Sequence, residues 1–355
     1  MLFNFLTSLV EQYSFLNVFK YITFRTGLAL MTSLLIVFLI GAPLIRIFSQ
    51  KDITGPIRQD GPIDHIIKKS GTPTMGGIII IIGMLTSTLF WADLTNIYIW
   101  SLIFISLSLG LLGFIDDLLK IKHNNSIGLN SKLKFSGQLV IGLITLMIII
   151  NFSDHEFIQN LYFPFFKNLI IDLGIFFIPF GLFVIIGSSN AVNLTDGLDG
   201  LATVPIMLVA LSFTFISYVV GNVIFSEYLQ IQFISGVGEI SIFCGAIVGS
   251  CLGFLWYNAP PAKIFMGDTG SLSLGGSLAA VAIIAKHEIV LAIIGGLFVL
   301  ETVSVIIQVI SFKLTGKRVF MMAPIHHHFE KKGWAESTIV IRFWIIAIIL
   351  ALIGL

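Results

Sequence analysis

The chain has 355 residues, of which 56% are apolar and only 11% are charged, and its mean hydropathy is +1.00. A soluble domain carries about twice that fraction of charged residues, so the composition excludes a soluble protein. The formal net charge of +1 gives no support for nucleic-acid binding. The two cysteines, Cys244 and Cys251, lie in one apolar run, which favours packing residues over a metal site or a disulfide.

Apolar runs long enough to cross a bilayer recur along the chain and predict a single polytopic membrane domain, residues 1–355. The first twenty residues are typical of an interfacial helix and not of a removable signal peptide. The predicted fold is an all-α bundle of about ten transmembrane helices over 24–48, 74–92, 97–115, 134–151, 170–187, 201–220, 239–257, 271–285, 289–312 and 338–355.

Two further features of the spans bear on their packing. The seventh span holds Gly245, Gly249 and Gly253 at four-residue spacing, which predicts a face for close helix packing. No internal repeat is evident in the sequence, and this weighs against a transporter built from inverted repeats.

Basic residues are distributed unevenly between the predicted loops. Sixteen of the twenty lie on one side of the membrane, and the other side keeps only Lys20, Arg25, Lys167 and Lys286. The positive-inside rule places the richer face in the cytoplasm. Because the predicted number of spans is even, both termini are then expected to be periplasmic.

Acidic residues gather at the cytoplasmic ends of the spans, although charges near a bilayer are costly. Asp116 and Asp117 follow the third span, and Lys120 lies on the same side of the helix at i+3 or i+4. Two carboxylates in this position could bracket Mg²⁺ or a phosphate-bearing substrate from two directions. The alternative is a solvated helix end with a local ion pair.

Two more acidic segments lie between later spans. Asn193, Asp196 and Gly200 fall at i, i+3 and i+7, which predicts one side of a helix, and Asp199 lies beside them. The alternative for this segment is an Asx-rich turn. Asp268 lies where a loop turns into a predicted helix N-terminus, so it is either a ligand for Mg²⁺ or simply an N-cap.

Three consecutive histidines, His326, His327 and His328, lie in a predicted cytoplasmic loop. Consecutive side chains point apart, which favours phosphate contact or ordering of the loop over a zinc site. Glu301 lies inside the ninth span, where an acid is either functional or a buried hydrogen-bond partner.

Lysines lie near these acids in the sequence, including Lys69, Lys120 and Lys134. Each alone is typical of a positive-inside anchor, but beside so many acids some are expected to hold phosphates. Acids and lysines at a membrane surface together predict Mg²⁺-dependent phosphoryl transfer to or from a lipid, which is chemistry of positioning and charge neutralisation.

These motifs resemble the phospho-N-acetylmuramoyl-pentapeptide transferase family, within the polyprenyl-phosphate N-acetylhexosamine-1-phosphate transferase superfamily. Matching stretches run from Lys68 to Trp334, and residues 69–77 and 323–334 are specific to this branch. The resemblance implies transfer of phospho-MurNAc-pentapeptide from UDP-MurNAc-pentapeptide to undecaprenyl phosphate, which gives lipid I and UMP in peptidoglycan synthesis. It implies the bacterial cytoplasmic (inner) membrane, an active site on its cytoplasmic face, and a homodimer.

The resemblance also implies roles for individual residues. Mg²⁺ is expected at Asp268, and catalysis is expected to involve Asp116, Asp117, Asp268 and His327. Substrate contacts are expected from a second set: Lys69, Lys120, Lys134, Asn193, Asp196, Asp199, His326 and His328. Direct attack by the lipid phosphate and a covalent aspartyl intermediate both stay open, as does the identity of the base.

Three other functions fit the sequence less well. A polyprenyl-phosphate GlcNAc-1-phosphate transferase would not explain the triple histidine followed by Gly333-Trp334. A lipid-linked transporter or flippase predicts acids near the bilayer midplane, whereas only Glu301 lies there. A structural scaffold would have no use for four polar loops of this kind.

Overall fold

The structure, a computed structural model, describes residues 1–55, 71–123, 128–152, 158–166 and 169–355. Within these ranges the regular secondary structure is helical apart from an isolated bridge between Thr54 and Pro73 and one short antiparallel hairpin, in which β1 (Asn160–Tyr162) pairs with β2 (Ile170–Asp172). Nine of the described helical segments are long and apolar enough to cross a membrane, and a tenth, shorter apolar helix covers Gly77–Trp91. The predicted all-α membrane bundle is confirmed.

The long helices follow the predicted order along the chain. They are α2 (Ile22–Gln50), α4 (Gly77–Trp91), α5 (Ile97–His123), α6 (Ser131–Phe152), α8 (Phe177–Thr195), α9 (Thr203–Val220), α11 (Ile240–Asn258), α12 (Gly267–Ile284), α14 (Gly296–Thr315) and α16 (Glu336–Gly354). Short helices connect or precede them: α1 (Leu2–Ser8), α10 (Val223–Leu229), α13 (Glu288–Ile294) and α15 (Ile325–Lys331). Turns of 3-10 helix cover Ser14–Lys20, Gly174–Phe176 and Val237–Glu239.

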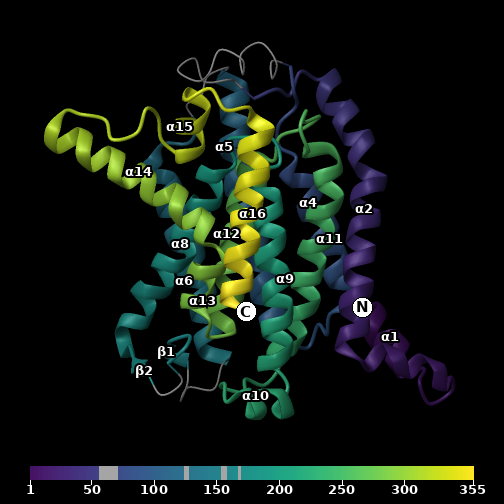
Figure 1. The fold of residues 1–355 in the computed structure, drawn as a ribbon. Helices are drawn as coiled ribbons and strands as arrows, with labels where there is room; N and C mark the ends of the chain where they lie inside the picture. Colours follow the sequence, from purple (N-terminus) through teal and green to yellow (C-terminus); the bar gives the residue numbers. More distant parts are fainter. Residues whose placement is uncertain (56–70, 124–127, 153–157, 167–168) are drawn as a thin grey trace.

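Both ends of the chain lie toward the same end of the bundle. Figure 1 shows the two termini in the lower half of the view and α15 at the upper end. An even number of crossings brings the chain back to its starting side, so this arrangement agrees with ten spans. The polar site described below lies at the upper end, where α5 finishes.

Helix α12 forms the centre of the bundle, and 94% of its residues are buried. Its sequence alternates small residues such as Gly275, Gly276 and Ser277 with leucine and alanine. Small residues allow the surrounding helices to approach closely. Helices in a membrane associate through such close packing, because lipid is as apolar as their side chains and no hydrophobic force drives them together. Helices α4, α5, α8 and α9 contact α12, so the helix with the lowest hydropathy of the nine is the one shielded from lipid.

The predicted glycine face of the seventh span is confirmed as a packing surface. On α11, Gly245, Gly249 and Gly253 lie against α2, and a side chain on any of them would collide with α2 atoms. At Gly249 an added Cβ would overlap the backbone carbonyl of Leu30. The two cysteines of α11 are buried and free, as expected of packing residues.

Three predicted spans differ from the observed helices. The third was expected to end at residue 115, but α5 continues to His123. The fifth was expected over 170–187, whereas residues 170–172 form β2 and α8 runs on to Thr195. The ninth was expected as one helix over 289–312, but the chain breaks at Gly295 between α13 and α14. Beyond this break α14 leaves the bundle at an angle (Figure 1).

Candidate active site

Three carboxylates from two helices meet at the upper end of the bundle. Asp116 and Asp117 lie in the last turns of α5, and Asp268 lies in the first turn of α12. All three are buried, and each offers an oxygen within 4.8 Å of the others. Carboxylate oxygens are the preferred ligands of hard divalent cations. Such a cluster can hold a metal ion, so the donor set fits the metal site expected from the sequence.

Asp117 caps the N-terminus of α12. Its Oδ1 accepts a hydrogen bond from the Asp268 backbone N–H at 3.1 Å, and its Oδ2 accepts from the Thr269 N–H at 3.0 Å and the Thr269 hydroxyl at 2.8 Å. A carboxylate is favoured here because the first N–H groups of a helix have no partner within the helix. Asp117 therefore fixes where α12 begins and where Asp268 points.

Glycines allow these helices to come together. A Cβ at Gly113 of α5 would overlap the backbone carbonyl of Asp268, and one at Gly77 of α4 would overlap the backbone of Gly270. Gly267 adopts φ +73°, a left-handed conformation that side chains disfavour, and an added Cβ there would also meet Asp117 Oδ2. The backbone contact, not only the side chains, therefore brings the three acids together.

Two lysines lie against the acids. Lys120 Nζ is 2.6 Å from Asp116 Oδ2 and 3.0 Å from Asp268 Oδ2, and Lys134 Nζ is 2.5 Å from Asp268 Oδ2. The expectation that Lys120 lies on the same side of α5 as the acids is confirmed. The lysine side chains are 25% and 17% exposed, so the cluster is reached from solvent on this side. Two ammonium groups face three carboxylates, which leaves net negative charge for a cation.

Asn193 completes the shell around Asp268. Because α8 extends to Thr195, Asn193 lies on the last turn of the helix. Its Nδ2 donates to Asp268 Oδ1 and to the Ser271 hydroxyl, both at 2.8 Å. Asp268 thus has one oxygen facing Asn193 and the other facing the lysines. Sequence reasoning had not assigned roles to Thr269 and Ser271, although their place directly after Asp268 in a helix start is a usable signal.

The expectation that Asn193, Asp196 and Gly200 share one helix face was wrong. Helix α8 ends at Thr195, and Gly200 adopts φ +72°, so the segment turns instead. Asp199 is buried, and its Oδ2 accepts from the Ala262 N–H at 2.9 Å, which ties this turn to the loop before α12. In these contacts Asp199 holds the turn in place, while Asp196 is only partly buried.

The three histidines make hydrogen bonds or close contacts with three different partners, but they do not all point apart, because the ring centroids of His326 and His327 are 4.1 Å apart. His326 Nδ1 lies 3.0 Å from Glu301 Oε1, and His327 Nδ1 lies 2.6 Å from Glu330 Oε2. His328 Nδ1 accepts from the Met321 N–H at 3.1 Å. The buried contact of Glu301 with His326 matches the hydrogen-bond partner that was one of its two expected roles. Lys69 lies outside the described residues.

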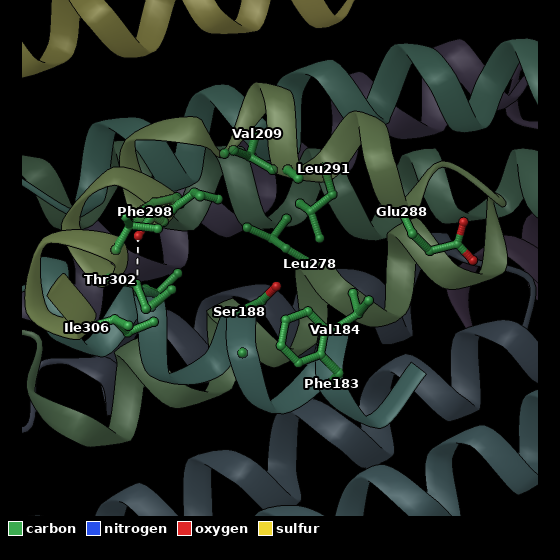
Figure 2. Close-up of a pocket in the computed structure, with 18 residues that line it drawn as sticks. Phe183, Val184, Ser188, Val209, Leu278, Glu288, Leu291, Phe298, Thr302 and Ile306 are labelled. Carbon is green, nitrogen blue, oxygen red and sulfur yellow. Dashed lines mark hydrogen bonds between the residues drawn. The ribbon is translucent and has the colours of Figure 1, made fainter. Parts of the chain in front are cut away.

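An apolar cavity of about 270 Å³ lies between α8, α9, α12, α13 and α14. Figure 2 shows its lining, which includes Phe183 and Val184 of α8, Leu278 of α12 and Phe298 of α14. Phe183 and Ile306 at its rim are exposed on the outside of the bundle. Val192 also lines the cavity and precedes Asn193, so one helix joins the cavity to the acidic cluster.

Comparison with known proteins agrees with this site. The glycosyl transferase family 4 model matches residues 99–286, which is more than half of the chain. The phospho-N-acetylmuramoyl-pentapeptide-transferase signature 1 matches residues 69–81. The phospho-N-acetylmuramoyl-pentapeptide-transferase of Pelagibacter ubique (strain HTCC1062) is 66% identical over all of this chain and 98% of its own length. The enzyme of that name from Maricaulis maris (strain MCS10) is 55% identical, with the same coverage. The chain therefore belongs to the phospho-N-acetylmuramoyl-pentapeptide-transferase family, within glycosyl transferase family 4.

Proposed function

We propose that the cluster of Asp116, Asp117 and Asp268 with Lys120 and Lys134 is where this enzyme carries out its transfer. The substrates are UDP-MurNAc-pentapeptide and undecaprenyl phosphate, and the products are lipid I and UMP. The observation that supports this site is the meeting of three buried carboxylates and two lysines at one end of an apolar bundle. Charges at such a position are costly and need a functional reason.

Mg²⁺ is the proposed cofactor, held by Asp268 together with Asp116. Each of these two carboxylates has an oxygen within 3.0 Å of Lys120 Nζ, whereas both oxygens of Asp117 accept hydrogen bonds from the start of α12. When bound, the ion neutralises charge on the diphosphate and on the leaving UMP. Asp117 then acts by orienting Asp268, which divides the two adjacent aspartates into different roles.

The lysines are proposed to contact the diphosphate of the nucleotide sugar. In the structure Lys120 and Lys134 share Asp268 Oδ2, and both are partly exposed on the side from which a substrate would enter. A lysine ammonium group forms charge-assisted hydrogen bonds with phosphate as well as with carboxylate oxygens, so a bound diphosphate can share the lysines with Asp268. Lys69, Asn193, Asp196 and the histidine segment are proposed to line the rest of the nucleotide-sugar site, with His327 among the catalytic groups. Asp199 is proposed to support the same site through its turn.

In the proposed reaction an oxygen of the lipid phosphate forms a bond to the phosphorus attached to MurNAc. The bond from that phosphorus to the oxygen of UMP breaks, and UMP leaves with the electron pair. A phosphate monoester is largely ionised near neutral pH, so little proton removal is needed. Direct attack suits the arrangement, because Asp116 is paired with Lys120 and Asp117 is occupied at α12. Asp116 is the better placed of the two to accept a remaining proton.

The apolar cavity beside α8 and α14 is proposed to receive the polyprenyl chain. Its rim residues are exposed where lipid surrounds the bundle, and α8 leads from Val192 in the cavity to Asn193 in the site. A lipid lying along this helix would bring its phosphate toward the acids. A transporter function finds no support here, because the described acidic cluster lies at the helix ends and not at the middle of the spans.

The orientation proposed for the enzyme follows from charge. Among the residues that the structure describes, most lysines and arginines lie at the end of the bundle that carries the site, which supports an active site on the cytoplasmic face of the bacterial inner membrane. Both termini are then periplasmic. A homodimer is proposed from the family resemblance.

The proposed function predicts a metal-dependent release of UMP. Purified chain in detergent, given UDP-MurNAc-pentapeptide, undecaprenyl phosphate and Mg²⁺, is expected to release UMP, to stop when EDTA removes the metal, and to recover when Mg²⁺ is restored. UDP-GlcNAc serves as the control substrate and is expected to give no release. Release from UDP-GlcNAc alone would assign the chain to the sister activity, and undiminished release in EDTA would remove the metal from the proposal.

A further inference from the structure

Glu301 and His326 form a buried pair that links α14 to the histidine segment. Both residues are 0% exposed, and Glu301 Oε1 lies 3.0 Å from His326 Nδ1. Glu301 belongs to a spanning helix, so its carboxylate is held inside the bundle by an element that does not itself carry the acidic cluster. Burying a carboxylate at such a depth is costly unless it has a partner.

The other ring nitrogen of His326, Nε2, points at the turn that contains Asp196 and Gly197. A Cβ added to Gly197 would overlap His326 Nε2, so the ring lies directly against the Asp196–Gly197 backbone. This Nε2 is buried and has no hydrogen-bond partner among the described residues. A buried polar atom left in that state costs about 1–3 kcal/mol, and such an atom in a native site points to a partner that binds there.

The contact with Glu301 decides which nitrogen carries the proton. A carboxylate only accepts hydrogen bonds, so in the neutral imidazole it selects the tautomer with hydrogen on Nδ1 and a lone pair on Nε2. The same logic operates where a buried carboxylate orients a catalytic imidazole. His326 is therefore held with an acceptor facing the turn that precedes Asp199.

Helix α14 also fixes the segment that leads into the histidines. The side chain of Gln308 accepts from the Val319 and Phe320 N–H groups at 3.0 and 2.9 Å, and donates to the Phe320 carbonyl at 2.9 Å. Gln308 and Glu301 are two turns apart on the same helix. Together they attach both ends of the 319–326 segment to α14, which limits the freedom of the His326 ring.

We propose that Glu301 is a positioning residue, which acts through His326 on the Asp196–Gly197 turn of the proposed nucleotide-sugar site. It holds the ring against Gly197 and presents Nε2 as an acceptor to an N–H or O–H group of the bound nucleotide sugar. Because Asp196 is assigned to the nucleotide sugar only by the proposed function, the role of Glu301 depends on that function.

A matched pair of variants tests this role. Glu301→Met keeps an unbranched side chain of similar size but removes the acceptor, whereas Glu301→Gln keeps a carbonyl that can accept from Nδ1–H. For Glu301→Met the KM for UDP-MurNAc-pentapeptide is expected to rise about tenfold or more, as loss of one buried hydrogen bond implies, while the KM for undecaprenyl phosphate stays unchanged. Glu301→Gln is expected to recover most of this loss.

Two further variants complete the experiment. Ser304→Ala removes a hydroxyl whose one hydrogen bond among the described residues goes to the Glu301 backbone carbonyl on the same helix, and is expected to leave both KM values unchanged. His326→Ala is expected to raise the same KM as Glu301→Met, and the double variant to be no worse than the worse single one. A wild-type KM for the nucleotide sugar in Glu301→Met, or equal rises for both substrates, would overturn the positioning role. If the proposed function is wrong, the wild-type chain itself releases no UMP. If only the positioning role is wrong, the wild-type chain is active and the KM values of the variants do not follow the expected pattern.

Discussion

Asp268→Asn is expected to lower turnover by about a thousandfold or more while leaving the protein folded. Asp268 has the most contacts of the three acids to groups proposed to meet substrate. Its Oδ1 accepts from Asn193, and its Oδ2 lies within 3.0 Å of both Lys120 and Lys134. Asparagine keeps the size and the contact with Asn193 but removes the charge that would hold a cation and align the two lysines.

The measurement is UMP release under saturating substrates, with thermal unfolding followed in parallel. Glu227→Gln provides the control, because this exposed acid lies on α10, away from the site. The control is expected to retain wild-type turnover. Near-normal turnover in Asp268→Asn would show that Asp268 does not hold the metal, and would contradict the proposed active site.

Asp117→Asn is expected to weaken folding as well as catalysis, by a different route. The Asp117 carboxylate accepts three hydrogen bonds from Asp268 and Thr269, and an amide in its place presents an N–H group to at least one of those donors. Loss of a helix N-cap costs about 1–2 kcal/mol. Loss of the cap is expected to displace the start of α12. Because α12 carries Asp268, this displacement is also expected to lower turnover about a hundredfold.

Thr269→Val is the matched variant for this second prediction. It removes only the hydroxyl donor and keeps both backbone N–H groups, so a loss of about 1 kcal/mol is expected, with a smaller loss of turnover than in Asp117→Asn. Urea or thermal unfolding in detergent gives the stability. Asp117→Asn with wild-type stability and no activity would contradict the capping role and make Asp117 a direct catalytic group.

The local parts of the site could be predicted from the sequence. Helical spacing places Lys120 beside Asp116 and Asp117, and glycine before Asp268 indicates a helix start. Loop charge and an even number of spans place these segments on one side of the membrane. The capping of α12 by Asp117 could not be predicted, because it depends on how closely α5 approaches α12, and the spacing of α5 residues carries no information on α12.

The predicted ends of the third and fifth spans failed for one physical reason. The fifth span was expected to end at residue 187, before the polar residues Ser188, Ser189 and Asn190, yet α8 continues through them. Ser189 donates to the Leu272 carbonyl and Asn190 donates to Gln138, so the protein interior satisfies these groups at membrane depth. A prediction from hydropathy assumes that polar residues are exposed to water. It therefore ends a span too early where the polar side of a helix faces other helices.

The role of Glu301 shows the same limit. Its position in a spanning helix marks it as unusual from the sequence alone, but its partner lies 25 residues further along the chain. No helical spacing connects Glu301 with His326, because the two lie on different helices. Only the packing of α15 over the Asp196–Gly197 turn brings the pair and the proposed substrate site together.

Binding of Mn²⁺, used as a paramagnetic substitute for Mg²⁺, tests the central claim most directly. Electron paramagnetic resonance on purified chain with UDP-MurNAc-pentapeptide is expected to show one bound Mn²⁺ per chain that Mg²⁺ displaces. Asp268→Asn is expected to lose this bound ion, and Glu227→Gln is expected to keep it. Binding of Mn²⁺ to Asp268→Asn with the affinity of the unsubstituted chain would contradict a metal site at Asp116 and Asp268.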